Sequence, residues 1–193
     1  MSYKDEFLTI FKSAIKREGA DKLLDWLEKS DFFAAPCSTK FHCAYEGGLV
    51  EHSVNVYNRL LSLVKKEYGD DWQKKYSNET VAICGLLHDL CKVHYYDTEF
   101  RNAKIDGTWR QVPYYTRRET LPYGHGEKSV FILQSFIKLS TEEALAINWH
   151  MGGFDDRAKG GNFSISEAYA KYKLCVLMHA ADLLATYIDE ERG

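Results

Sequence analysis

The sequence predicts an all-α fold class, a mostly helical bundle with a small β-hairpin insertion around residues 94–118. Apolar side chains recur at three- and four-residue spacing through most of the chain, which is the pattern of amphipathic helices. Only three prolines occur in 193 residues, and few prolines favour long helices. This length and a hydrophobic content of 45% fit one domain, which we place at residues 1–193.

The first part of the chain is expected to hold three helices and one irregular loop. Residues 4–29 carry two groups of apolar residues, which predict two short amphipathic helices broken near Gly19. Residues 31–48 contain a proline and paired glycines, which predict a loop. A long apolar stripe then predicts a helix over residues 49–68.

The middle of the chain changes from helix to strand. Ser77 can cap a helix over residues 80–93, on which His88 shares a face with apolar neighbours. The following segment is rich in aromatic and β-branched residues, with Asp106-Gly107 at its middle. Because Asp-Gly between two extended runs is a strong turn signal, we expect a β-hairpin here.

Helices are expected again in the last third. One is predicted over residues 127–138, and a second over residues 141–149 after a capping-box sequence that starts at Ser140. A polar, glycine-containing loop follows. The last helix is expected to start near Ser166 and to include Asp182.

Composition excludes several functional classes. The net charge of −3 leaves no global basic field for nucleic-acid binding, so any nucleotide contact must come from a local patch. The five cysteines are odd in number and form no Cys-x-x-Cys pair, which favours buried, reduced thiols. No run approaches the roughly 20 apolar residues of a membrane span, and no signal peptide is recognisable. We therefore expect a cytoplasmic protein with no membrane partner.

Six side chains of metal-ligand type are spread in order along the chain. They are His52, His88, Asp89, His125, His150 and Asp182. The pair His88-Asp89 lies in an apolar segment, where a buried charge is costly unless it is paired or bound to metal. Neutral imidazole and carboxylate suit Zn, Mn, Fe or Co, and six such ligands are enough for two ions. The sequence therefore predicts a dinuclear metal site built from several helices.

Five segments that carry these residues resemble the HD-domain metal-dependent phosphohydrolase superfamily. They are FHCAYEGGLVEHS (41–53), GLLHDLCK (85–92), LPYGHGEKS (121–129), INWHMGG (147–153) and HAADLLATY (179–187). The resemblance covers residues 40–186, and the helices of residues 1–35 could then be a cap on this core or a dimer surface. Residues 42–53 look most like the HD domain of bacterial 3′–5′ exoribonucleases, although no nucleic-acid-binding barrel is recognisable ahead of them.

The resemblance implies a ligand set for each of two metal ions. The first ion would take His52, His88, Asp89 and Asp182, and the second would take His125 and His150 while sharing Asp89 as a bridge. Divalent Mn, Fe, Mg, Co, Ni or Zn all remain open. Two cations can bind a phosphoryl oxygen and activate a bridging water, so no side-chain nucleophile is needed. The sequence contains no Gly-x-Ser-x-Gly motif and no Gly-rich phosphate loop, which agrees with this chemistry.

Four further side chains are candidates for contacts with phosphate. Lys92 would neutralise phosphate charge as a catalytic partner of Asp89, or it would be a solvated surface lysine. His42 would line the mouth of the pocket or pack within its loop. Arg118 and Lys128 could clamp a phosphate or be ordinary surface charges.

The hairpin interleaves aromatic residues with five basic ones between His94 and Arg118. One or two of these side chains could contact a nucleobase and its phosphate. We expect most of its aromatic residues to pack onto the helices instead.

These observations together lead us to expect a metal-dependent phosphohydrolase. Its substrate would be a phosphorylated small molecule, namely a nucleotide or a short oligonucleotide, cleaved as a monoester or a diester. Two other hypotheses stay open: a di-iron oxygenase with the same ligand order, and a non-catalytic, metal-stabilised module that binds a nucleotide or a partner. The sequence leaves the oligomeric state open.

Overall fold

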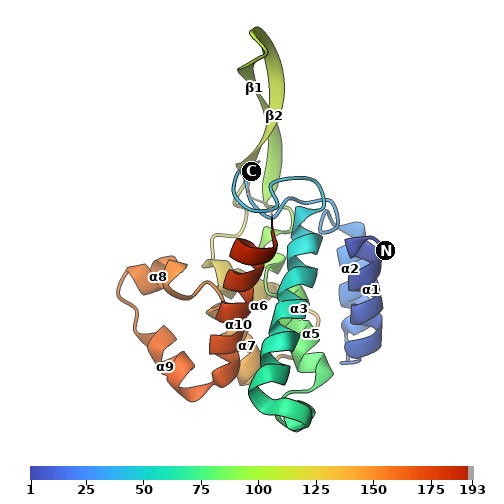
Figure 1. Cartoon of the computed structure of the whole chain (residues 1–193), viewed down its shortest axis with the longest axis vertical. Helices are drawn as coiled ribbons and strands as arrows, with labels where there is room; N and C mark the ends of the chain where they lie inside the picture. Colours follow the sequence, from blue (N-terminus) through green and yellow to red (C-terminus); the bar gives the residue numbers. More distant parts are fainter. Residues whose placement is uncertain (191–193) are drawn as a thin grey trace.

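The computed structural model describes residues 1–190, and it confirms the predicted fold class of helices with one small antiparallel sheet (Figure 1). The longer helices are α1 (Tyr3–Ala14), α2 (Ala20–Lys29), α3 (Gly48–Tyr68), α5 (Asn78–Leu87), α6 (His125–Gln134), α7 (Thr141–Asn148), α9 (Ser164–Lys171) and α10 (Lys173–Leu184). Helices α4 (Trp72–Lys75) and α8 (Asp156–Lys159) are single turns, and β1 (Tyr96–Ile105) and β2 (Thr108–Arg117) form the sheet. Three 3₁₀ turns are η1 (Gly69–Asp71), η2 (Leu90–Lys92) and η3 (Gly152–Phe154), and η4 (Ala185–Asp189) is a π-helical turn.

Helix α3 is the centre of the bundle. It packs against α1, α5 and α10, and α10 also contacts α7 (Figure 1). Leu60, Leu87 and Met178 lie in this core with no exposed surface. Because burying a side chain of this size contributes about 1.5–3 kcal/mol, these contacts hold the helices that carry the candidate ligands.

A glycine sets the distance between α3 and α5. A Cβ atom built on Gly85 would lie 2.5 Å from the Cα of Tyr57, so only glycine allows the two backbones to approach this closely. His88 follows one turn after this contact, and His52 precedes it on α3. The close approach therefore brings the imidazoles of the two helices together.

Two predicted caps, the predicted break near Gly19 and the predicted end of the long helix are present. The Ser77 hydroxyl accepts a hydrogen bond from the Thr80 amide at the start of α5, and Ser140 forms a capping box at the start of α7. Gly19, with φ of 90°, precedes α2, and α3 ends at Gly69. Each cap satisfies amide groups that the helix itself leaves unpaired.

The prediction of one helix over residues 80–93 is wrong. Helix α5 ends at Leu87, and the chain continues through Asp89 into the tighter turn η2. The Nδ1–H of His88 donates to the Gly85 carbonyl, 2.9 Å away. Local hydrogen bonding therefore replaces the regular helix where the chain passes the candidate site.

The predicted last helix is two helices. Tyr172 has an extended backbone, with φ of −127° and ψ of 108°, and this break separates α9 from α10. Apolar spacing continues across the break, so the sequence pattern alone does not show it. Because of the break, α9 and α10 run in different directions (Figure 1). Helix α10 packs along α3 and α7, and α9 contacts α10.

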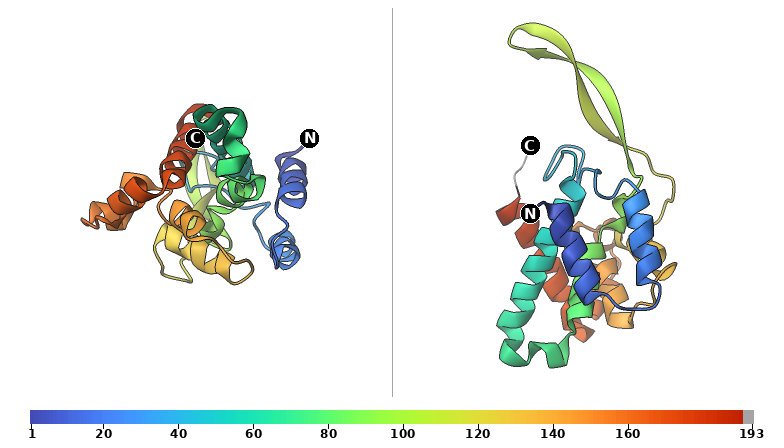
Figure 2. Two further views of the ribbon diagram at one scale, coloured as in Figure 1. Left: turned by 90° about the horizontal axis from the view of Figure 1, so that it is seen from below. Right: turned by 90° about the vertical axis from the view of Figure 1, so that its right-hand side faces the viewer.

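The hairpin has the predicted turn but not the predicted packing. Ile105 pairs with Thr108, and both Asp106 and Gly107 have positive φ, as a two-residue hairpin turn requires. The strands project from the helices (Figures 1 and 2). The outer aromatic residues are open to solvent, with Phe100 65% and Trp109 69% exposed. The expectation that most aromatic residues pack onto the helices is therefore wrong for the outer half.

Within residues 1–190, none of the helices combines the length and the apolar character that crossing a membrane would require.

Candidate metal centre

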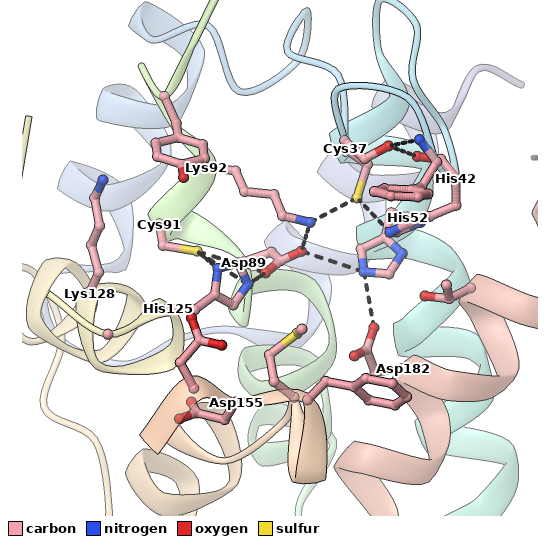
Figure 3. Close-up of a pocket in the computed structure, with 18 of the residues that line it drawn as sticks. Cys37, His42, His52, Asp89, Cys91, Lys92, His125, Lys128, Asp155 and Asp182 are labelled. Carbon is pink, nitrogen blue, oxygen red and sulfur yellow. Dashed lines mark hydrogen bonds and ion pairs between the residues drawn. The ribbon is translucent and has the colours of Figure 1, made fainter. Parts of the chain in front are cut away.

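The six predicted ligands come together from six places in the fold. They are His52 on α3, His88 at the end of α5, Asp89 in the turn that follows, His125 at the start of α6, His150 just after α7 and Asp182 on α10. Asp89 lies between His125 on one side and His52 on the other (Figure 3). Residues separated by up to 130 positions in the sequence thus share one site, although their role as ligands stays a prediction.

The two carboxylate oxygens of Asp89 face different histidines. Oδ1 lies 2.8 Å from Nε2 of His125 and 3.5 Å from Nε2 of His150. Oδ2 lies 3.5 Å from Nε2 of His52 and 3.6 Å from Nε2 of His88. This is the arrangement that a carboxylate bridging two cations would need.

Backbone carbonyls fix the direction of two imidazoles. Nδ1–H of His88 donates to Gly85, and Nδ1–H of His150 donates to the Ile147 carbonyl at 2.7 Å. Each ring is therefore held with Nε2 toward Asp89. Nε2 of His150 is buried and has no hydrogen-bond partner among residues 1–190, which is costly for a polar atom unless it binds a ligand.

The other half of the site places two imidazole nitrogens against each other. Nε2 of His52 lies 3.1 Å from Nε2 of His88 and 3.3 Å from Oδ1 of Asp182. Burial lowers the pKa of His52, but Glu190 and Asp182 more than compensate and raise it to about 10. Burial lowers the pKa of His88 to about 3. The His52 ring therefore lies between the carboxylates of Asp182 and Glu190.

Five groups of donor atoms among the described residues could hold a cation, each with its atoms within 4.8 Å of one another. They are His52, His88 and Asp182; His88, Asp89 and His150; Asp89, Cys91 and His125; Cys37, His42 and His52; and His42, Cys43 and Glu190. Imidazole and carboxylate donors fit divalent transition metals. The residues present therefore fit the metal ions that the sequence predicts, while the number and identity of the ions remain proposals.

Lys92 is buried beside Asp89 and is not a solvated surface residue. Its Nζ donates to Oδ2 of Asp89 at 2.7 Å and to Sγ of Cys37 at 3.1 Å. Burial alone would lower the pKa of Lys92, but the Asp89 carboxylate raises it well above its usual range. For the Asp89 carboxyl, burial has the opposite effect and raises the pKa. Lys92 and His88 outweigh this and lower the pKa of Asp89 well below its usual range. The two side chains are therefore a charged pair in the floor of the site.

His42 lies at the edge of the same site. Its ring packs edge-on against His52, with ring centroids 4.9 Å apart, and its Nδ1 lies 2.6 Å from Oε2 of Glu190. Both His42 and His52 line the central cavity. The structure thus places His42 at the pocket and not only within its loop.

The two other candidate phosphate contacts differ in position. Nζ of Lys128 is paired with Glu119 at 2.7 Å and lies 4.9 Å from the centre of the Tyr95 ring, inside the cavity lining. Arg118 is 67% exposed and does not line the cavity among the described residues, whereas its neighbour Arg117 does. Arg117 is the last residue of β2 and Arg118 follows the strand, so of these two neighbours the one that ends the strand lines the pocket.

Sequence reasoning missed two features of the site. Glu190 contacts both His42 and His52, yet it lies in a charged C-terminal stretch without any apolar period that would indicate burial. Cys91 was expected as a core thiol, but its Sγ lies 3.3 Å from Nδ1 of His125. Its seven-residue spacing from Cys84 suggests a shared helix face, whereas the turn after α5 moves it to the site.

The cavity above these residues has a volume of about 840 Å³. Its lining includes Tyr95 and Tyr96 at the base of the hairpin, and Tyr123 and Phe154 from other loops. Pockets of about 300–1,000 Å³ with aromatic walls and a few polar groups are typical small-molecule sites. The candidate ligands therefore form the polar end of a pocket of substrate size.

The chain belongs to the HD-domain family, because the family model for the HD domain matches residues 49–187. A curated relative is the dihydroneopterin 2′,3′-cyclic phosphate phosphodiesterase of Methanocaldococcus jannaschii, which is 32% identical over 78 residues. The aligned segment covers 39% of this chain but 28% of the relative's length, so the chain spans less than a third of that protein. No solved structure matches the chain.

Proposed function

We propose that this protein is a metal-dependent phosphohydrolase that cleaves a phosphoester of a nucleotide or a short oligonucleotide through a metal-activated water. The observation that carries the proposal is Asp89, whose two oxygens face two separate pairs of histidines beside a charged lysine. The HD-domain match and the phosphodiesterase name of the relative support a hydrolase. We further propose that residues 1–193 form one domain with two bound ions.

Bound divalent cations would supply a Lewis acid and a water of lowered pKa at the base of the cavity. His52, His88, Asp89 and Asp182 would hold one ion, and His125 and His150 would hold the other with Asp89. The ammonium of Lys92 remains charged in the buried site, where a charge acts more strongly than in water. We assign it the role of stabilising negative charge that develops on the phosphoryl group.

The wall of the cavity supports a substrate with a ring system next to its phosphate. Tyr95 and Tyr96 offer flat faces that could stack on a base. His42, Lys128 and Arg117 place polar or positive groups in the same lining. The relative is named for a 2′,3′-cyclic phosphate. Cyclic nucleotides therefore belong in the first set of substrates to test.

The test is hydrolysis with Mn²⁺ across nucleoside mono- and triphosphates, cyclic nucleotides and short oligonucleotides. Asp89→Ala should abolish the activity, because it removes the shared ligand. Asp70→Ala is the matched control, since Asp70 is exposed and lies in η1, outside the cavity lining. Full activity of Asp89→Ala, or no hydrolysis of any phosphoester, would refute the proposal. Iron-dependent oxygen consumption in place of hydrolysis would support the oxygenase hypothesis instead.

A further inference from the structure

The last described residue, Glu190, is a buried carboxylate that the proposed mechanism does not use. It follows the π-helical turn η4, and its side chain has no exposed surface. Burial of a charge is unfavourable unless hydrogen bonds and opposite charges compensate for it. Its position beside the candidate metal centre therefore calls for a physical reason.

Glu190 uses both oxygens on groups at the edge of the site. Oε1 lies 2.9 Å from Nδ1 of His52 and accepts a hydrogen bond from Nδ2 of Asn55 at 3.3 Å. Oε2 lies 2.6 Å from Nδ1 of His42. One carboxylate thus joins a candidate metal ligand to a histidine that lines the pocket.

A carboxylate accepts hydrogen bonds, so both imidazoles must present Nδ1–H to Glu190. When Nδ1 carries the proton, the lone pair of neutral His52 is on Nε2, which faces Asp182 and His88. A carboxylate on the far nitrogen of a metal-binding histidine fixes its tautomer and raises its basicity. The geometry of His52 meets both conditions.

We propose that Glu190 is a positioning residue, which holds His52 ready to bind metal through Nε2 and holds the His42 ring in the lining of the cavity. The inference rests on the metal centre of the proposed function. Glu190 acts through the two imidazoles and does not itself contact the metal or the phosphoester.

A simpler role would be to fasten the C-terminal turn to α3. The neighbouring residue already supplies such an attachment, since Asp189 forms a two-point ion pair with Arg59, including Nε to Oδ2 at 2.6 Å. That pair is on the same two elements but lies outside the cavity lining. Asp189→Asn therefore weakens the attachment and leaves the Glu190 contacts in place, which makes it the matched control.

The experiment measures the affinity of metal-free protein for Mn²⁺, from the loss of the free-ion paramagnetic resonance signal during titration. Glu190→Ala should weaken binding by about 10- to 100-fold, the usual effect of losing such a partner. Glu190→Gln should keep most of the affinity, because the oxygen of the amide can still accept the Nδ1–H of His52. The NH₂ of the amide would then donate to Nδ1 of His42, which would carry its own proton on Nε2. Asp189→Asn should bind as the unmodified protein does. Circular dichroism and the melting temperature would verify that each variant is folded.

Unchanged Mn²⁺ affinity in a folded Glu190→Ala variant would overturn the inference. So would an equal loss in Glu190→Ala and Asp189→Asn, since that result would assign the effect to the attachment of the turn. Absence of Mn²⁺ binding by the unmodified protein would instead overturn the metal centre and the proposed function with it. Because the readout is binding, failure to find a hydrolysed substrate does not affect the test.

Discussion

Replacing Lys92 with methionine should destabilise the metal-free protein much more than the metal-loaded protein. In the structure Lys92 and Asp89 form a buried pair, with Nζ and Oδ2 2.7 Å apart. Methionine has a similar length but no charge, so the variant leaves the Asp89 carboxylate buried without its cation. Bound metal ions would supply a replacement charge next to the same carboxylate.

The size of the effect follows from the burial of the pair. Removing one partner of a buried ion pair costs about 3–5 kcal/mol. His125, with Nε2 2.8 Å from Oδ1 of Asp89, compensates in part, so we expect the lower end of that range. In a domain of this size, 1 kcal/mol corresponds to roughly 2–4 °C in melting temperature, so the metal-free variant should melt roughly 6–12 °C lower.

The assay is thermal unfolding of Lys92→Met and the unmodified protein, each with chelator and with excess Mn²⁺. Lys74→Met is the matched control, since Lys74 also pairs with an aspartate three residues away, but on the surface. Exposed pairs contribute little, so this control should shift the melting temperature by no more than about 2 °C. An equal decrease for Lys92→Met with and without Mn²⁺ would refute the reasoning, because the metal would then not share Asp89 with Lys92.

Three further predictions concern other parts of the molecule. Gly85→Ala should lower the free energy of unfolding by about 1–3 kcal/mol and weaken Mn²⁺ binding, because the added Cβ would meet the backbone of Tyr57. Urea unfolding and Mn²⁺ titration check this, and unchanged stability and affinity would contradict it. Burial raises the pKa of Glu143, but Arg17 lowers it below the ordinary value of 4.5, so their interaction stabilises the fold above pH 4.5 and is lost on acidification. The stability of Glu143→Gln should therefore vary less with pH below 4.5, and parallel curves of stability against pH would disprove this. Replacing residues 101–112 with a two-residue Asn-Gly turn keeps the pairing of Phe100 with Pro113 and should change the melting temperature by less than about 2 °C, because the removed side chains bury little core surface. A larger decrease would show that the outer hairpin stabilises the helices.

Much of the fold was predictable because local patterns specify it. The turn at Asp106-Gly107 needs positive φ at both positions, and this local requirement is visible in the sequence. The cap at Ser77 is local in the same way. By contrast, the apolar spacing continues past the end of α5 and across the break at Tyr172, so the spacing alone does not locate either of them.

The candidate site was predictable in part for a chemical reason. Histidine and aspartate are costly to bury unless they are paired or bound to metal. Six such residues, two of them adjacent in an apolar segment, therefore predict a shared site from the sequence alone. Glu190 carries no such signal, since exposed glutamates are common at chain ends and its burial depends on the turn that places it against α3. The choice between Arg117 and Arg118 depends on where β2 ends, which composition does not report.

The projecting hairpin (Figure 2) is a two-stranded sheet, so among the described residues each of its strands has one edge that no further strand covers. Such edges can act as templates on which the strand of another molecule pairs and aggregates. Arg101, Lys104 and Arg110 are exposed along the outer part of the two strands and outnumber the exposed Glu99 and Asp106, so two such segments would repel each other weakly. Salt screens this repulsion. Colloidal stability of the protein should therefore be greatest in dilute buffer and should decrease as ionic strength increases.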